Sequence, residues 1–227
     1  MKVLACYNIK GGVGKTAAAV NLAYESTFSS AQTLIWDLDP QGAASFYFRI
    51  KPSIKGGGRK LISGQTPLLD RIKATDYRGL DLLPADHSLR NLDLILDDQH
   101  KSVKRLNQLL SSIENDYEYV LLDCAPTMSL VTEAVFRAAD ALVIPLVPTT
   151  LSLRGLSQIL AFRKNKGFKH LALVPFFSMV DRRKKLHRHI VETLPKQFPA
   201  ISPVEIPYCT EVERMGDVRA PVGVFAR

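Results

Sequence analysis

Short runs of apolar residues alternate along this chain with longer segments in which apolar residues recur at helical spacing. The apolar runs predict strands at residues 2–8, 32–38, 80–84, 118–123, 141–147, 171–177 and 204–206. The amphipathic segments predict helices at residues 15–29, 67–74, 88–113, 129–139, 152–166 and 184–195. Such alternation is typical of an α/β fold, in which helices cover both faces of a mostly parallel, twisted sheet.

One segment interrupts the alternation of strands and helices. Residues 42–66 contain Pro52 and three consecutive glycines from residue 56, and they predict a mobile, irregular loop. The chain as a whole has 227 residues, which suits one α/β domain with a substantial core. We therefore expect a single domain that spans residues 1–227.

The composition is that of a globular protein. Hydrophobic residues make up 46% of the chain, which argues against global disorder. No apolar run approaches the roughly 20 residues of a membrane span, and the first strand leaves no room for a signal peptide. Three cysteines, Cys6, Cys124 and Cys209, are too few and too scattered for a disulfide framework. These features favour a cytoplasmic protein without a membrane partner.

A glycine-rich motif with two lysines follows the first strand and precedes the first helix. It consists of Lys10, Gly11, Gly12, Val13, Gly14, Lys15 and Thr16, and Ala17 continues it into the helix. Glycines let backbone N–H groups approach phosphate, and a helix N-terminus favours an anion. We expect Lys15 to bridge the β- and γ-phosphates of a nucleotide and the Thr16 hydroxyl to ligate Mg²⁺. Lys10 lies at the mouth of this loop, which suggests that it acts on a nucleotide held by another copy of the chain.

Carboxylates follow two other predicted strands. Asp37 and Asp39 end one strand, and Asp123 ends another. Ligands of open α/β sheets bind beyond the carboxyl ends of the strands, so these side chains should converge on the phosphates. Asp123 is expected to hold Mg²⁺ through water, Asp39 to orient the attacking water near the metal, and Asp37 to organise the same loop. The alternative for each is a helix cap or a turn residue.

The chain carries a formal net charge of +8, and its basic residues are clustered. Residues 163–190 hold nine Lys or Arg and one acidic residue, Asp181, so this stretch alone matches the excess of the whole chain. Residues 49–60 form a second basic cluster without an acidic residue. Such clusters favour binding to the phosphate backbone of a nucleic acid. The alternative is a solvated helix face, which is the usual place of a charge run.

Four motifs together resemble those of the ParA/MinD/Soj family of deviant Walker A ATPases. They occupy residues 10–16, 37–42, 123–126, and 144–148 followed by 152–155. The Asp39-Pro40-Gln41 sequence is closer to ParA than to MinD. The resemblance implies a P-loop NTPase that forms a sandwich homodimer with two ATP molecules at its interface. It implies catalytic roles for Lys10, Lys15, Asp39 and Asp123, metal binding by Thr16, Asp39 and Asp123, and ATP and Mg²⁺ as cofactors.

The resemblance also implies partners. These are nucleoid DNA and a ParB-like or cargo-adaptor protein that stimulates hydrolysis, with a plasmid, a chromosome origin or a large protein assembly as cargo. The family carries base contacts where Asp181 and Pro207 lie, although Asp181 could equally neutralise its basic neighbours. The DNA-contact candidates are Arg182, Arg183, Lys184, Lys185, Arg214 and Arg219. The phosphate loop begins at residue 10, so we expect no helix-turn-helix before it and sequence-independent DNA binding.

Two other functions compete with a nucleoid-associated positioning ATPase. A MinD-like membrane ATPase would end in a basic amphipathic helix, and residues 221–227 carry no such stripe. A P-loop ligase or reductase would couple ATP to small-molecule chemistry, but it gives no reason for the basic excess or for the acidic motif at residues 37–41. We therefore expect an ATP-dependent, dimerising ATPase that positions a cargo on DNA.

Overall fold

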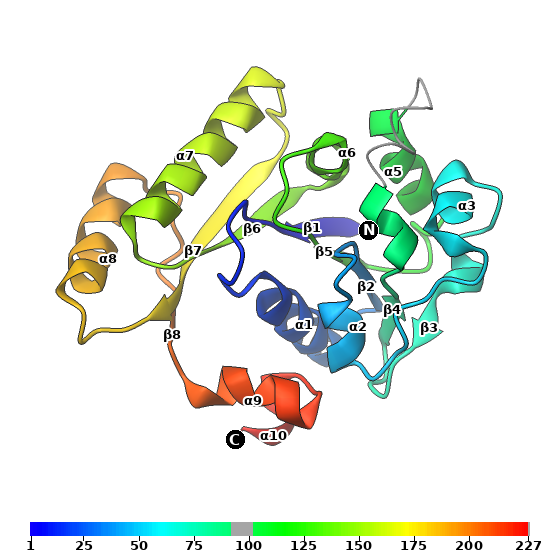
Figure 1. Ribbon diagram of the computed structural model, residues 1–227, viewed down its shortest axis with the longest axis horizontal. Coiled ribbons are helices and arrows are strands. Elements are labelled where there is room, and N and C mark those ends of the chain that lie inside the picture. The colour runs from blue at the N-terminus through cyan, green and yellow to red at the C-terminus, as the bar shows by residue number, and fades with distance from the viewer. Residues whose placement is uncertain (92–101, 227) are drawn as a thin grey trace.

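A single mixed sheet forms the centre of the protein in the computed structural model, which describes residues 1–91 and 102–226 (Figure 1). The strand order is β3-β4-β2-β5-β1-β6-β7-β8. The strands are β1 (Lys2–Cys6), β2 (Thr33–Asp37), β3 (Lys73–Ala74), β4 (Leu80–Leu83), β5 (Tyr119–Asp123), β6 (Ala141–Leu146), β7 (Ala172–Val180) and β8 (Glu205–Pro207). All neighbouring strands are parallel except β3 and β4, which confirms the expected α/β class.

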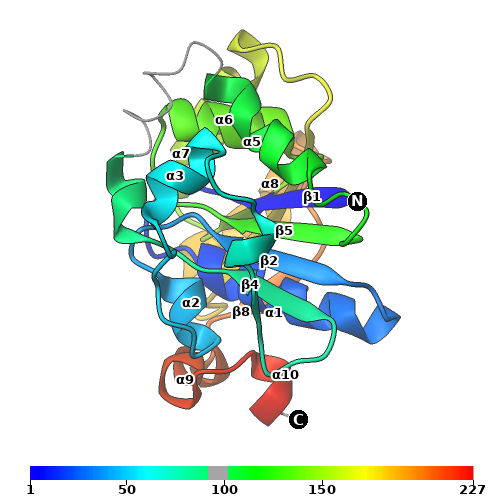
Figure 2. The same ribbon diagram turned by 90° about the vertical axis from the view of Figure 1, so that its right-hand side faces the viewer.

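Helices cover both faces of this sheet (Figure 2). They are α1 (Lys15–Ser26), α2 (Ala43–Tyr47), α3 (Gly57–Ser63), α5 (Ser102–Ser111), α6 (Leu130–Ala138), α7 (Thr150–Asn165), α8 (Lys185–Gln197), α9 (Thr210–Val218) and α10 (Val222–Phe225). Short 3-10 turns are η1 (Thr27–Ser29), η2 (Leu69–Arg71) and η3 (His87–Asn91). In both views α5, α6 and α7 lie on one face, and α1, α2 and α9 lie on the other. None of the helices in the described ranges is long and apolar enough to cross a membrane.

Successive side chains of the central strands belong alternately to two separate hydrophobic cores, one on each face of the sheet. In β2, Leu34 and Trp36 belong to the core beneath α5, α6 and α7, whereas Ile35 belongs to the core beneath α1 and α2. All three side chains are fully buried. A parallel strand that is buried on both faces reads as a continuous apolar run because successive side chains point to opposite faces. The sheet therefore holds the ends of its strands in fixed positions, and the site is built there.

The prediction of an irregular loop at residues 42–66 is wrong. This segment contains α2 and α3, and of the three consecutive glycines that suggest a loop, Gly56 precedes α3 whereas Gly57 and Gly58 form its first two residues. Gly42 precedes α2 with a φ of 68°, and Gly56 and Gly64 flank α3 with φ values of 91° and 76°. Positive φ values are accessible to glycine at little cost, so a helix can begin and end at such residues.

Other element predictions differ from the structure at particular places. Residues 67–74 form η2 and the edge strand β3 instead of a helix. Of the helical stretch predicted at residues 88–113, η3 and α5 are present, and residues 92–101 lie outside the described part of the chain. Helices α9 and α10 were not predicted from the pattern of apolar residues.

Candidate nucleotide-binding site

The glycine loop between β1 and α1 forms an open cradle at the carboxyl edge of the sheet. Gly12 and Gly14 have φ values of 68° and 93°, which disfavour any residue with a Cβ atom. A Cβ atom added to Gly11 or Gly12 would meet no atom within 4 Å, so the space above the loop is open. Gly14 is the N-cap of α1, whose first backbone N–H groups have no intrahelical acceptor. This geometry fits a phosphate group.

The side chain of one loop lysine, Lys15, is hydrogen-bonded to the backbone of the other, Lys10. The Lys15 ammonium is buried and donates a hydrogen bond of 3.2 Å to the Lys10 carbonyl oxygen. Burial lowers the pKa of Lys15, and the carboxylates of Asp123 and Asp39 oppose this shift. Lys10 itself is half-buried at the mouth of the loop. The structure therefore brings Lys15 close to two of the three predicted strand-end carboxylates, Asp123 and Asp39.

Two buried carboxylates lie side by side next to the loop. Asp37 ends β2 and pairs in register with Asp123, which ends β5. Burial raises the pKa of Asp123 well above its ordinary value, and the Asp37 charge adds to this shift, whereas Thr16 and Lys15 reduce it. Neither carboxylate oxygen of Asp123 has a well-formed hydrogen bond in the described part of the chain. A buried, unpartnered carboxylate is costly unless a cation completes the site.

Asp37 is anchored by the first turn of α2. Its Oδ2 atom accepts hydrogen bonds from the backbone N–H and the hydroxyl of Ser45, at 2.8 and 2.7 Å. Its Oδ1 atom has no partner among the described residues, and burial raises the pKa of this carboxyl group to about 6. Asp39 is more exposed, and its Oδ1 atom accepts from the Gln41 backbone N–H at 2.9 Å. Asp37 thus organises the segment that carries Asp39, as expected from the sequence.

The oxygen atoms of Thr16 and Asp123 are suitable ligands for a divalent cation that also binds a phosphate group. Within residues 1–91 and 102–226, no group of three or more His, Cys, Asp or Glu side chains forms a metal cage of its own. Mg²⁺ is usually held by one or two carboxylates together with water and substrate phosphates. Thr16 and Asp123 supply such a partial set beside the open loop.

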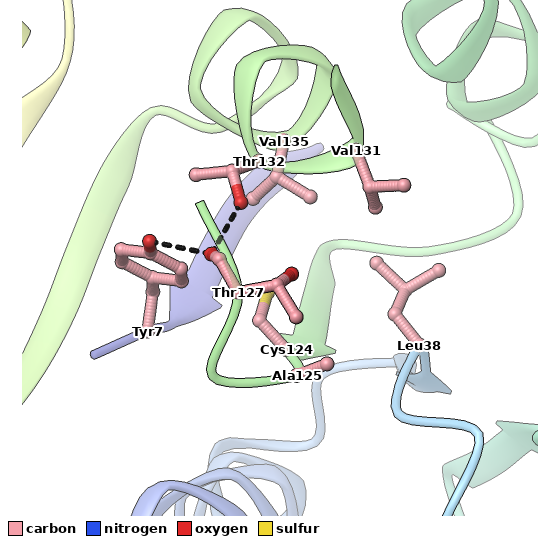
Figure 3. Close-up of a pocket in the computed structure, with 8 residues that line it drawn as sticks. All are labelled: Tyr7, Leu38, Cys124, Ala125, Thr127, Val131, Thr132 and Val135. Carbon is pink, nitrogen blue, oxygen red and sulfur yellow. Dashed lines mark hydrogen bonds between the residues drawn. The ribbon is translucent and has the colours of Figure 1, made fainter. Parts of the chain in front are cut away.

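A small pocket lies beside the loop, between the end of β1 and α6 (Figure 3). Its walls include Tyr7, Leu38, Cys124, Ala125 and Thr127. The hydroxyls of Tyr7 and Thr132 both donate to the Thr127 carbonyl oxygen, each at 2.7 Å. The Leu38 backbone N–H donates to the Asp123 carbonyl oxygen at 2.9 Å. The segments that follow Asp37 and Asp123 are therefore tied to β1 and to each other. The sequence alone did not point to Tyr7 or Thr132.

The predicted base-contact residues, Asp181 and Pro207, lie at the carboxyl ends of β7 and β8. Pro207 is exposed and pairs in register with Val180, so Asp181 and Pro207 end adjacent strands. Arg183 engages both Asp181 oxygens, at 2.9 and 3.0 Å, and lowers the pKa of that carboxyl group to about 2. In this structure Asp181 therefore neutralises a basic neighbour, which is the alternative open at the sequence level.

The DNA-contact candidates fall into two places. Arg182, Arg183, Lys184 and Lys185 are exposed at the start of α8, whereas Arg214 and Arg219 lie on α9 and its C-cap. Three are already engaged by acids, because Arg182 pairs with Glu205 at 2.7 Å, Arg183 pairs with Asp181 at 2.9 Å, and the Lys184 ammonium lies 4.0 Å from Asp181. The Arg219 guanidinium stacks 4.5 Å from the centre of the Phe46 ring, and Arg214 stacks 5.4 Å from that of Phe225.

The basic cluster of residues 163–190 does not form one surface. Its members before β7 are Arg163, Lys164, Lys166 and Lys169, and those after β7 are Arg182, Arg183, Lys184, Lys185 and Arg188. Nine residues of β7 separate the two groups, which at the usual rise of a strand is roughly 25–30 Å. In Figure 1, α7 ends at the opposite end of β7 from the start of α8.

Comparisons with known proteins show the family to which the chain belongs. Residues 1–168 match the AAA domain family AAA_31. The sporulation initiation inhibitor protein Soj of Bacillus subtilis is 31% identical over 202 residues, which cover 87% of this chain and 80% of Soj. The chromosome partitioning protein ParA of Caulobacter vibrioides is 31% identical over 205 residues, which cover 87% of this chain and 77% of that protein.

Solved structures share the fold. Cobyrinic acid a,c-diamide synthase from Mycobacterium smegmatis, with a bound ATP analogue and magnesium, superposes with a TM-score of 0.82 at 25% identity, over 92% of this chain and 86% of that one. An ATP complex of Cyanothece McdA gives a TM-score of 0.81 at 20% identity, over 99% of this chain and 94% of that one. The chain therefore belongs to the ParA/Soj family of P-loop ATPases.

Proposed function

We propose that this protein is an ATP-dependent positioning ATPase. ATP with Mg²⁺ assembles two copies into a dimer, the dimer binds DNA without sequence preference, and hydrolysis releases it. The observation that carries the proposal is the buried Asp123 carboxylate, which makes no well-formed hydrogen bond within residues 1–91 and 102–226 and lies beside Lys15 under an open glycine loop. Such a site is costly when empty and is completed by a phosphate-bound cation.

Each residue of the site has a separate task in this proposal. Lys15 and the loop N–H groups bind the β- and γ-phosphates, and Thr16 with Asp123 holds the metal. Asp39, half-exposed at the mouth, orients the attacking water. Lys10 extends to the nucleotide of the second copy, so each site is complete only in the dimer. Mg²⁺ bound to ATP neutralises charge on the phosphates and stabilises the charge that develops during transfer.

DNA binding is proposed at the start of α8, with Arg214 and Arg219 on α9 as secondary contacts. Helix α8 begins at Lys185 and has no acidic residue in its first turn. Positive side chains are unfavourable at a helix N-terminus, because the helix dipole already favours an anion there. A phosphate of the DNA backbone would be attracted by Lys184, Lys185 and the helix end together. Contacts of this kind carry no sequence information.

The proposal gives the protein a cytoplasmic, nucleoid-associated place and a partner. A ParB-like or cargo-adaptor protein would stimulate hydrolysis and connect the dimer to a plasmid, a chromosome origin or a large protein assembly. The likeness to ParA and Soj over most of the chain supports this role.

Mobility-shift and mass measurements test the proposal directly. Wild type, Lys10→Ala and Lys15→Ala are mixed with random-sequence DNA in the presence of ATP, ADP or no nucleotide, and the mass of the free protein is measured in parallel. We expect salt-sensitive DNA binding and a dimer mass only with ATP and only for wild type. DNA binding that is indifferent to the nucleotide would contradict the switch.

A second candidate function is a P-loop ligase that couples ATP to amide formation. The likeness to cobyrinic acid a,c-diamide synthase at 25% identity favours it. A ligase would show ATP turnover that depends on a small carboxylic acid and an amine donor and is unaffected by DNA. Turnover that DNA and a partner protein stimulate without such substrates would exclude it.

A further inference from the structure

Asn8 is a fully buried polar residue between the end of β1 and the glycine loop. Its Nδ2 atom donates a hydrogen bond of 2.9 Å to the Pro145 carbonyl oxygen in β6. Its Oδ1 atom accepts a hydrogen bond of 3.0 Å from the Lys10 backbone N–H. Buried amides require partners, and both partners here are backbone groups of different segments. Asn8 therefore joins the first residue of the loop motif to the neighbouring strand.

The Lys10 residue is held on both sides by these contacts. Asn8 binds its N–H, and the Lys15 ammonium binds its carbonyl oxygen at 3.2 Å. The next two residues, Gly11 and Gly12, are exposed, with open space where a side chain would lie. Packing therefore does little to hold this part of the loop, and the Asn8 hydrogen bond links it to the sheet.

Helix α7 supports Asn8 from another side. A Cβ atom on Gly155 of α7 would lie 3.4 Å from Ile9 Cγ1 and 3.7 Å from Asn8 Oδ1. The helix thus approaches the Asn8–Lys10 turn closely because residue 155 lacks a side chain. Asn8 is thus hydrogen-bonded to β6 and lies close to α7, and neither of these elements belongs to the loop.

We propose that Asn8 is a positioning residue that sets the orientation of the Lys10 backbone and so directs the Lys10 side chain out of its own loop. The inference rests on the proposed function, in which Lys10 acts on the nucleotide of a second copy. Asn8 touches no nucleotide in this account. Its loss therefore affects dimer assembly and turnover, whereas binding of nucleotide to the single chain depends on Lys15 and is preserved.

The test compares Asn8→Ala with Lys10→Ala and with a matched control, Asn21→Ala. Asn21 is also an asparagine whose side chain joins two segments, because it donates to the Ala17 carbonyl oxygen at 2.8 Å and accepts from the Val222 N–H at 2.8 Å. Melting temperature, ADP affinity, dimer fraction with ATP and Mg²⁺, kcat and KM are measured for each. We expect Asn8→Ala to bind ADP as wild type does but to lose the dimer and about tenfold or more in kcat. Asn21→Ala should lose melting temperature only.

A second variant keeps the test decisive if Asn8→Ala does not fold. Asn8→Asp retains an acceptor for the Lys10 N–H but loses the donor to Pro145 and adds a buried negative charge, so its dimer fraction should also fall below that of wild type. Wild-type dimer fraction and kcat in the folded Asn8 variants, together with their loss in Lys10→Ala, would overturn the inference alone. A Lys10→Ala protein that dimerises and turns over normally would instead overturn the proposed function.

Discussion

Replacing Asp37 by asparagine should change how the stability of the nucleotide-free protein depends on pH. Burial raises the pKa of Asp37 from its ordinary value of 3.8 to about 6. The folded protein therefore holds this proton more tightly than the unfolded chain does. The stability from this group is complete below pH 3.8 and is lost as the pH rises through about 6.

The size of the effect follows from the two pKa values. A difference of about 2 units corresponds to about 3 kcal/mol in total. By pH 5 the unfolded chain is largely ionised at this residue, so about half of that loss has already occurred. Between pH 5 and pH 8 wild type should lose a further ~1.5 kcal/mol from Asp37 that the asparagine variant does not lose.

The comparison between two pH values removes the cost of the substitution itself. Asparagine keeps an oxygen that accepts from Ser45, but it places an amide group where the unpartnered Oδ1 atom lies. An unsatisfied amide costs about 1–3 kcal/mol at either pH, so it cancels. Removing the Asp37 charge also relieves Asp123, which acts in the same direction.

Urea unfolding without nucleotide or Mg²⁺, at pH 5 and at pH 8, measures the effect. Asp37→Asn should gain at least ~1.5 kcal/mol relative to wild type on going from pH 5 to pH 8. Asp70→Asn, at an exposed turn, is the control and should gain nothing. A stability difference between Asp37→Asn and wild type that is equal at the two pH values, or that moves the opposite way, would refute the reasoning.

Three further predictions concern the site and the basic surface. Asp123→Asn removes the proposed metal-binding carboxylate and should lower Mg²⁺-dependent phosphate release about 100-fold or more. It also removes a costly buried carboxylate, so it should not destabilise the nucleotide-free protein at pH 8. Turnover near that of wild type would exclude the metal-binding role. Tyr7→Phe and Thr132→Val each remove one of the two donors to the Thr127 carbonyl oxygen, so each should lower the free energy of unfolding in urea by about 1 kcal/mol. The double variant leaves this oxygen without either donor and should lose about 1 kcal/mol more than the sum of the two single losses. Strict additivity would be inconsistent with a shared acceptor. The Lys184→Ala, Lys185→Ala double variant should reduce the slope of log affinity for random DNA against log salt by about 1–2, and an unchanged slope would show that DNA binds elsewhere.

The sequence predicts those parts of the site that lie in short, contiguous motifs. The glycine loop carries Lys15 and Thr16 within one motif, and Asp37 and Asp123 each follow an apolar run. The structure confirms that the parallel sheet brings these strand ends together, because Asp37 and Asp123 lie in register. Parallel order alone is enough to place such residues at one edge.

The parts that the sequence does not predict depend on contacts between distant segments. Asn8 binds Pro145, which is 137 residues away, and no local pattern marks that pair. Asp181 has a chemically sound use as a base contact, but Arg183 lies close enough to occupy both of its oxygens. The basic cluster appears continuous in sequence, yet β7 runs through its middle and separates its halves.

The central claim is that one nucleotide site needs residues from two copies of the chain, and mixing two inactive variants tests it most directly. Lys10→Ala retains Lys15, and Lys15→Ala retains Lys10, so a mixed dimer contains one complete site. Each variant alone should be inactive and monomeric, and an equal mixture should recover up to about half of wild-type ATP turnover, since only mixed dimers form and each holds one complete site of two. A mixture as inactive as its components, or full activity of Lys10→Ala alone, would contradict the account.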